Sequence, residues 1–240
     1  MLLKIFLLIV SVAILSGCFL DATPSTPGRW NLGDGSGTTA TDSGGNGNDG
    51  ILENGPVWVD GLIGKALEFD GVDDYVDFGN DESLRMKNEF TVSLWINAAT
   101  SQEGFYNPIS KGHEAANGWA LQGSKATLSF LIGDGTGNPG ATFSQDLRDE
   151  HWHHLVMTKS SSSGIGIKLY LDGAPDGSNP DATGDVARAD SWNLSIGRDT
   201  QNGRYFKGSI DEVRIYGRVL TAVEVSDLYS ELIRTQSPRQ

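Results

Sequence analysis

The chain has 240 residues, and its 18 lysines and arginines against 31 aspartates and glutamates give a formal net charge of −13. An acidic balance of this size argues against nucleic acid or an anionic lipid surface as the partner. The single cysteine excludes an intramolecular disulfide, and the 31 glycines, clustered between short apolar segments, are typical of an all-β domain with many turns.

The N-terminal segment has the pattern of an export signal. Lys4 is followed by the apolar run 5–15, which is too short to cross a bilayer as a helix. The run closes on the segment LSGC, which resembles a bacterial lipobox. That resemblance implies that residues 1–17 are a signal peptide and that Cys18 carries lipid. An ordinary secretory signal with an incidental cysteine is the alternative.

Residues 18–28 are expected to form a tether between this anchor and the folded domain. The segment contains two prolines and several small polar residues, a composition that favours an extended chain. Phe19 after the cysteine, in place of Asp, resembles an outer-membrane sorting signal if the host is Gram-negative. We therefore expect an extracytoplasmic protein of the cell envelope that is held to the membrane by its lipid.

Short strand-like runs, separated by turn residues, recur along the rest of the chain. The clearest alternation puts Phe90, Val92, Leu94 and Ile96 on one face of a strand. A series of short strands with little helix predicts an all-β fold. The predicted strands are 65–69, 75–78, 90–97, 126–132, 153–159, 165–171, 192–196 and 205–216.

One helix is expected, near the C-terminus. Residues 221–224 have the spacing of a capping box, and Val225, Leu228 and Tyr229 follow at helical intervals. The prediction is a short helix, followed by a frayed tail at 233–240.

Several of these segments, in the same order, resemble the laminin-G-like domains of the concanavalin A-like lectin/glucanase superfamily. The resemblance implies one domain over residues 29–232. It also implies a jelly-roll sandwich of two curved antiparallel sheets, in agreement with the strand pattern. The matching segments are RWNLGDGSGTTATDSGGNGNDGIL (29–52), ALEFDGVDDYVDFG (66–79), FTVSLWIN (90–97), HWHHLVMTK (151–159), KLYLDG (168–173) and FKGSIDEVRIYGRVLTAVEV (206–225).

In the family that the chain resembles, a structural calcium often ties the N-terminal loop to the last strand. Matched by position, Asp42, Asn46 and Asp211 would be its side-chain ligands, and Ca²⁺ takes oxygen ligands of this kind. The alternative is that Asp42 and Asn46 cap turns, and that Asp211 pairs with Arg214 or a loop. The acidic run at 69–76 offers a second metal position, although a hairpin with solvated acids is the favoured interpretation.

The superfamily also includes glycoside hydrolases, which use two carboxylates that face the sugar. The string nearest to their motif is Glu68-x-Asp70-x-x-Asp73, which ends on the shorter acid and is interrupted by Gly71. We therefore expect that the protein is not an enzyme, with glycan cleavage as the alternative.

The histidine-rich segment HWHH raises the question of zinc. His153 and His154 point to opposite faces of a strand and cannot easily share one ion. His151 and His153 could share one, but no cysteine or strong third ligand follows them in the sequence. The favoured interpretation is structural, with Trp152 and His154 on one face beside Val156.

Sugar binding would require exposed aromatic rings with polar groups around them. The candidates are Tyr106, His113, Trp119 and Tyr205, with Phe105 as a further one, all in segments expected to be loops. Together with the anchor, they predict a membrane-anchored recognition module for a carbohydrate or protein ligand. A glycan-cleaving enzyme on the same fold and a structural envelope or adhesion component are the alternatives. The sequence leaves the oligomeric state open.

Overall fold

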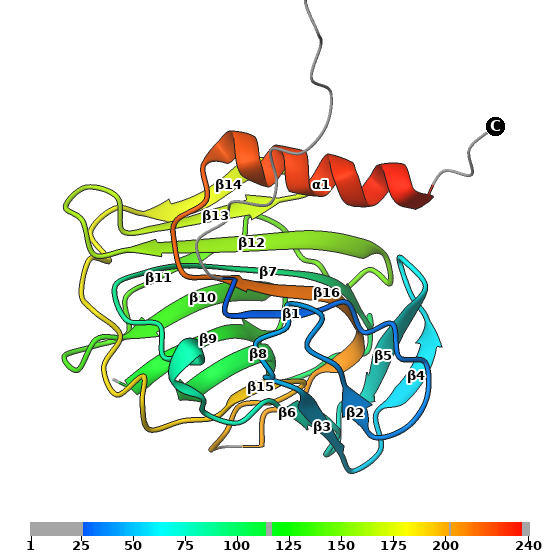
Figure 1. The fold of residues 1–240 in the computed structure, drawn as a ribbon. Coiled ribbons are helices and arrows are strands. Elements are labelled where there is room, and N and C mark those ends of the chain that lie inside the picture. Colours follow the sequence, from blue (N-terminus) through cyan, green and yellow to red (C-terminus); the bar gives the residue numbers. More distant parts are fainter. Residues whose placement is uncertain (1–25, 114–116, 202, 237–240) are drawn as a thin grey trace, which may run out of the picture.

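The computed structural model describes residues 26–113, 117–201 and 203–236. These residues form two stacked antiparallel sheets of eight strands each, which confirms the predicted jelly-roll sandwich (Figure 1). The first sheet contains β1 (Gly28–Trp30), β4 (Val57–Asp60), β5 (Lys65–Asp70), β7 (Glu89–Ala98), β12 (Trp152–Ser160), β13 (Ile167–Leu171), β14 (Ala174–Asn179) and β16 (Lys207–Tyr216). The second contains β2 (Thr39–Ala40), β3 (Gly50–Glu53), β6 (Tyr75–Asp77), β8 (Phe105–His113), β9 (Asn117–Ser124), β10 (Thr127–Gly133), β11 (Gly140–Thr142) and β15 (Leu194–Ile196).

Both sheets combine strands that are consecutive in the chain with strands from distant parts of it. The first sheet has the order β14–β13–β12–β7–β16–β5–β4, and β1 pairs with β16. The second has the order β11–β10–β9–β8–β15–β6–β3–β2. Strands β6, β15 and β8 are therefore adjacent, so residues far apart in the sequence meet on one surface.

Apolar side chains that alternate along the strands fill the space between the sheets. Phe90, Val92, Leu94 and Ile96 of β7 are all buried in this core, as their alternation predicted. The ring of Phe90 packs edge-on against Phe130 of the second sheet, with ring centroids 6.2 Å apart. Truncating a buried aromatic residue of this kind typically costs about 3–5 kcal/mol of stability.

Helix α1 (Ala222–Gln236) lies across the outer face of the first sheet (Figure 1). Trp95, Val156 and Tyr170 point away from the main core and form a second apolar cluster with Leu228 and Leu232 of the helix. The helix therefore covers apolar side chains that the sheet would otherwise expose to water.

The capping box at the start of this helix is confirmed. The backbone N–H of Thr221 donates to Glu224 Oε2 at 2.7 Å, and the Glu224 N–H donates to Thr221 Oγ1 at 3.3 Å. Arg218, 2.7 Å from the same carboxylate, and then the Thr221 groups lower the pKa of Glu224 to about 2. The helix start is thus stabilised by charge as well as by hydrogen bonds.

The ends of the domain differ slightly from the prediction. Strand β1 begins at Gly28, the last residue of the expected tether, and α1 continues through four residues of the expected tail, 233–236. The signal peptide 1–17 and Cys18 lie outside the described residues. Within the described part of the chain, no helix is long and apolar enough to cross a membrane.

Candidate ligand-binding face

The second sheet carries a polar face directed away from the core. Tyr75 and Asp77 flank the buried Val76 in β6, so strand alternation turns both toward the outer face. Asp77 lies opposite Ser195 of β15, which in turn lies opposite Ser110 of β8. We call the surface formed by Tyr75, Asp77, Phe105, Asn193, Arg198 and Arg204 the outer-sheet site.

The loop at 197–206 is fastened to β8 and brings two arginines to this face. The hydroxyl of Ser110 donates to the carbonyl oxygen of Arg198 at 2.9 Å. The backbone N–H of Asn107 donates to the carbonyl oxygen of Arg204 at 3.0 Å. Both arginines are therefore held at their backbones, one near each end of the loop.

The guanidinium of Arg198 lies over the ring of Tyr75. The guanidinium carbon is 3.3 Å from the centre of the ring, a cation–π contact. Asp77 Oδ2 is 3.9 Å from the same guanidinium, and the side-chain amide of Asn193 donates to both oxygens of Asp77 at 3.0 Å. These contacts hold a planar donor, a carboxylate and an amide side by side on the outer face.

A second arginine–aromatic pair lies at the other end of the loop. The guanidinium carbon of Arg204 is 4.8 Å from the centre of the Phe105 ring, and Phe105 is 56% exposed. Asp199 lies beside this arginine, with Oδ2 at 3.8 Å from Arg204 Nε. The exposed ring gives the face an apolar surface on which a flat ligand can stack.

Buried polar atoms without partners concentrate around the same loop. Nine buried side-chain nitrogen and oxygen atoms among the described residues have no hydrogen-bond partner there, and five belong to Asn107, Ser195, Arg198 and Thr200. An unsatisfied buried group typically costs about 1–3 kcal/mol, and native proteins keep few of them. Among the described residues, these groups are therefore more concentrated around this loop than elsewhere.

The residues predicted to bind a ligand differ in where they lie and in how far they are exposed. Tyr205 lies half-buried in the loop at 197–206, beside the outer-sheet site. Tyr106 and Trp119 are corrected: they are 3% and 0% exposed, because β8 and β9 are strands that turn these rings into the core. Burial raises the pKa of Tyr106 to about 12. His113 ends β8, and its side chain lies outside the described part.

Sequence reasoning missed the arginines and Tyr75. Tyr75 was assigned to a strand, and Arg198 and Arg204 lie in a segment without apolar alternation. Only the pairing of β6 with β15 brings Arg198 onto Tyr75. The one residue of the outer-sheet site that the sequence indicated was Phe105, which the sequence analysis named as a further ligand-binding candidate.

Asp42 closes the N-terminal loop through backbone hydrogen bonds. Its carboxylate accepts four backbone N–H groups at 2.9–3.2 Å, from Arg29, Gly44, Asn46 and Asn48. The side-chain amide of Asn46 donates to the carbonyl oxygen of Thr26 at 2.7 Å. Both residues therefore cap the loop, which was the alternative to calcium binding.

Asp211 holds a different loop. It is fully buried and accepts the backbone N–H groups of Ile63 at 3.2 Å and Glu212 at 2.7 Å. Burial raises the pKa of Asp211 to about 7. Arg214 pairs with Glu212 at 2.8 Å. Of the two partners expected for Asp211, Arg214 or a loop, the structure therefore shows the loop that contains Ile63.

The expected calcium ligands do not fit a cation as they lie. Four N–H groups occupy the Asp42 carboxylate, and Ca²⁺ would have to displace them to reach its oxygen lone pairs. The Asp211 carboxylate accepts N–H groups from another loop, whereas the backbone N–H of Asn46 donates to Asp42. One calcium held by all three residues stays a prediction.

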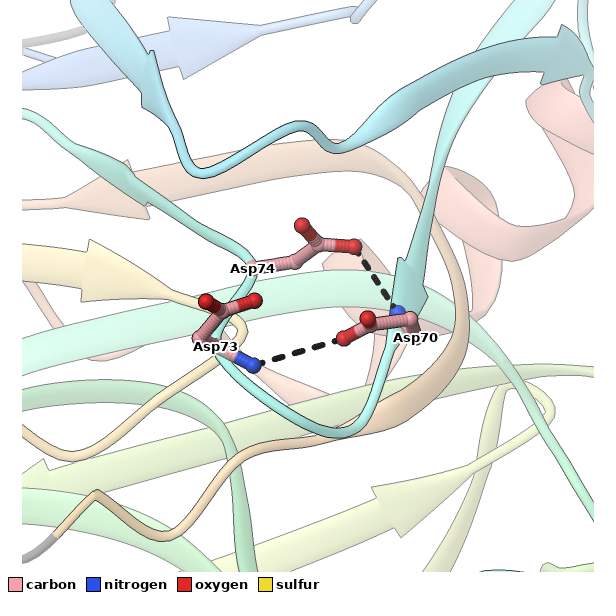
Figure 2. Close-up of side chains that lie close together, drawn as sticks. All are labelled: Asp70, Asp73 and Asp74. Carbon is pink, nitrogen blue, oxygen red and sulfur yellow. Dashed lines mark hydrogen bonds between the residues drawn. The ribbon is translucent and has the colours of Figure 1, made fainter.

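The acids of the turn between β5 and β6 lie close together, as Figure 2 shows. Asp70, Asp73 and Asp74 each offer an oxygen within 4.8 Å of the others. Asp70 Oδ1 accepts the N–H groups of Val72 at 2.7 Å and Asp73 at 3.4 Å, and Asp74 Oδ2 accepts the Asp70 N–H at 3.0 Å. Burial raises the pKa of Asp74. Asp70 caps the turn, but the favoured interpretation, a hairpin with solvated acids, is wrong in two respects: β5 and β6 belong to different sheets, so the segment crosses between them, and Asp74 is buried.

Comparison with known proteins places the fold. A laminin G family model, described as the concanavalin A-like lectin/glucanases superfamily, matches residues 70–226. Adhesion G-protein coupled receptor V1 of Danio rerio is 25% identical over 157 residues, which cover 61% of this chain and 2% of the receptor. Non-toxic nonhemagglutinin of Paraclostridium bifermentans is 26% identical over 117 residues, or 48% of this chain and 10% of that protein. The chain spans a small part of either relative.

Solved structures show the same fold. The binding domain of Paraclostridial Mosquitocidal Protein 1 has a TM-score of 0.70 at 16% identity, covering 85% of this chain and 52% of that one. The binding domain of botulinum neurotoxin serotype G has a TM-score of 0.69 at 15% identity, covering 86% and 51%. Domain 4 of AbnA, a GH43 extracellular arabinanase from Geobacillus stearothermophilus in complex with arabinotriose, has a TM-score of 0.66 at 23% identity, covering 85% and 97%. The chain thus spans about half of each toxin binding domain and nearly all of the arabinanase domain.

Proposed function

Because the chain belongs to the laminin G family of the concanavalin A-like lectin/glucanases superfamily, we propose that it is a recognition module that binds carbohydrate at the outer-sheet site. The observation that carries this proposal is the concentration of unpartnered polar atoms beside two arginine–aromatic pairs. The related arabinanase domain, described in complex with arabinotriose, supports a sugar as the class of ligand.

The chemistry of the site suits a sugar. A sugar ring presents apolar C–H faces, which stack on an exposed aromatic such as Phe105, and hydroxyls that both donate and accept. Arg198 and Asn193 supply donors, and Asp77 supplies acceptors. Since each arginine has an aspartate beside it, the charges of the two pairs balance, which favours a neutral sugar over an anionic one.

A glycan array and calorimetric titration of the full chain with neutral oligosaccharides, arabino-oligosaccharides first, test this proposal. We expect Phe105→Ala to weaken binding about tenfold, because the stacking surface is lost. Arg198→Ala should weaken it about 10–100-fold through lost charge-assisted hydrogen bonds.

The matched control is Val223→Ala, which truncates an exposed apolar side chain of α1, 69% exposed, on the other sheet. Its affinity should equal that of the wild type. An empty glycan array, or a loss of binding shared by the control, would contradict the proposal. Binding to a protein in place of a glycan would favour the other ligand class.

We propose binding and not cleavage as the activity. Glu68 and Asp70 are both exposed on β5, but Asp70 uses an oxygen to cap the following turn. A hydrolytic pair needs two carboxylates free to face a sugar from either side. Product analysis of bound oligosaccharides checks this point: intact sugar is expected, and cleavage that Glu68→Gln abolishes would show an enzyme.

We also propose that the module is displayed outside the cytoplasm through lipid on Cys18, which would leave the binding face free to meet glycans. The segment LSGC after an apolar run supports this proposal. Metabolic labelling with palmitate tests it: label on the wild type and none on Cys18→Ser is expected. Label retained by the variant, or absent from both, would contradict the anchor.

A further inference from the structure

A group of histidine and aspartate side chains lies at the start of β12, away from the outer-sheet site. Asp149, His151 and His153 occupy alternate positions. Glu150, between the first two, has a left-handed backbone with φ of 61° and directs its carboxylate to the hydroxyl of Thr100 at 2.7 Å. The turn therefore brings Asp149 back beside the two histidines, while Glu150 points elsewhere.

Asp149 lies close to each of the two histidines, and His151 has to turn its ring to complete a set of three ligands. Asp149 Oδ2 is 3.2 Å from His153 Nε2, and Asp149 Oδ1 is 3.6 Å from His151 Nδ1. Zinc holds such ligands tetrahedrally at about 2.0–2.1 Å, which separates neighbouring ligand atoms by about 3.3 Å. The aspartate thus lies at ligand spacing from both histidines.

Asp172 fixes the orientation of the His153 ring. Its Oδ2 lies 2.9 Å from His153 Nδ1, and its Oδ1 accepts the backbone N–H of His154 at 2.9 Å. With a proton on Nδ1 donated to Asp172, Nε2 is the nitrogen left for an ion, which would replace the proton that Nε2 shares with Asp149. A carboxylate behind a histidine in this way is the usual outer partner of a metal-binding imidazole.

We propose that Asp149, His151 and His153 form a zinc-binding site, with Asp172 as the positioning carboxylate. His151 Nδ1 is 2.8 Å from the carbonyl oxygen of Asp149, and the side chain is 78% exposed, so the ring can leave that contact and turn toward an ion held by the other two. The fourth position is open to water. Two imidazoles favour zinc over calcium, which takes oxygen ligands. Binding would fasten the turn at 149–151 to β12.

Asp149, the third ligand of the proposed site, precedes the two histidines. The sequence analysis considered only residues that follow them. The segment reads Asp-x-His-x-His, and alternate residues of an extended segment share a side. Asp172 comes from the turn after β13, whose pairing with β12 places it behind His153.

Calorimetric titration of the full chain with ZnCl₂, after treatment with a chelator, tests the site. One equivalent should bind, and His151→Asn, at an exposed position that does not threaten the fold, should weaken binding at least tenfold. Asp172→Asn should weaken it about 10–100-fold, as expected for a partner of a metal-binding histidine. Co²⁺ in place of zinc should give the visible absorption of a four-coordinate ion, lost in His151→Asn.

Asp73→Asn is the matched control, since it removes an acid from the turn between β5 and β6, where three carboxylates also lie together. Its zinc affinity should equal that of the wild type. The inference is overturned by an absence of binding, by binding that His151→Asn leaves unchanged, or by an equal loss in the control.

Discussion

His154 lies beside two aromatic rings on the outer face of the first sheet. Its ring is stacked with Trp95 at 5.1 Å and with Tyr229 of α1 at 6.0 Å between centroids, and its Nε2 is 2.9 Å from the hydroxyl of Ser93. Trp152 and Val156 belong to the same apolar cluster, as the alternation of β12 predicted. The histidine thus serves as an aromatic packing residue, and burial lowers its pKa to about 3.

This burial predicts a dependence of stability on pH. In the unfolded chain the imidazole titrates near 6.5, so between about pH 6.5 and 3 the unfolded state binds a proton that the folded state does not. The stability is therefore fully present above about pH 6.5 and declines as the pH falls, by about 1.4 kcal/mol per pH unit at most. Urea unfolding of His154→Gln should show a shallower decline over this range.

The exposed His151→Gln, measured with chelator present, is the control and should keep the wild-type pH slope. A slope that His154→Gln leaves unchanged would mean that His154 is protonated in the folded protein.

At the scale of the elements, β8 and β9 show where sequence reasoning fails. Phe105, Tyr106, His113 and Trp119 were expected to lie in loops. They lie in β8 and β9, because β8 has partners on both sides, β9 and β15. By contrast, β7 and the start of α1 were predictable, since an alternating run and a capping box are signals carried by neighbouring residues.

The candidate site could be predicted only in part for the same reason. Phe105 and Tyr205 could be named from the sequence as aromatics between apolar runs. The contact of Arg198 with Tyr75 depends on the pairing of β6 with β15, which local sequence does not reveal. Tyr106 alternates with Phe105 on one strand, so a single position decides which ring meets the solvent and which the core.

The N-terminal loop gives a prediction at the same scale. Asp42→Ala removes the acceptor of four backbone N–H groups, so unfolding in urea should show a loss of about 2–3 kcal/mol. The loss should be the same with CaCl₂ as with chelator, because N–H donors occupy the carboxylate. Asp181→Ala, at an exposed position, should change little. Calcium that stabilises the wild type but not Asp42→Ala would instead show a calcium site.

At the scale of the whole molecule, the two sheets have different surroundings. Helix α1 lies across the outer face of the first sheet (Figure 1) and covers apolar residues there. The outer face of the second sheet carries arginines, acids and an exposed ring. A substitution under α1 should therefore change the free energy of unfolding without changing the affinity for a ligand at the outer-sheet site.

Leu228→Ala tests that separation. Leu228 is buried between α1 and the first sheet, so its truncation should cost about 2–4 kcal/mol of stability in urea unfolding. Oligosaccharide affinity, measured by calorimetry under conditions where the variant stays folded, should equal that of the wild type. Weakened binding would show that the two faces are coupled.

Hydrogen–deuterium exchange of the full chain, with and without a saturating oligosaccharide identified on the array, tests the central claim most directly. Binding at the outer-sheet site predicts slower exchange in the loop at 197–206, in β6 and at the start of β8, with α1 and the turn at 70–74 unchanged. Protection confined to those two control segments would contradict the site. An unchanged loop at 197–206 under saturation would do the same.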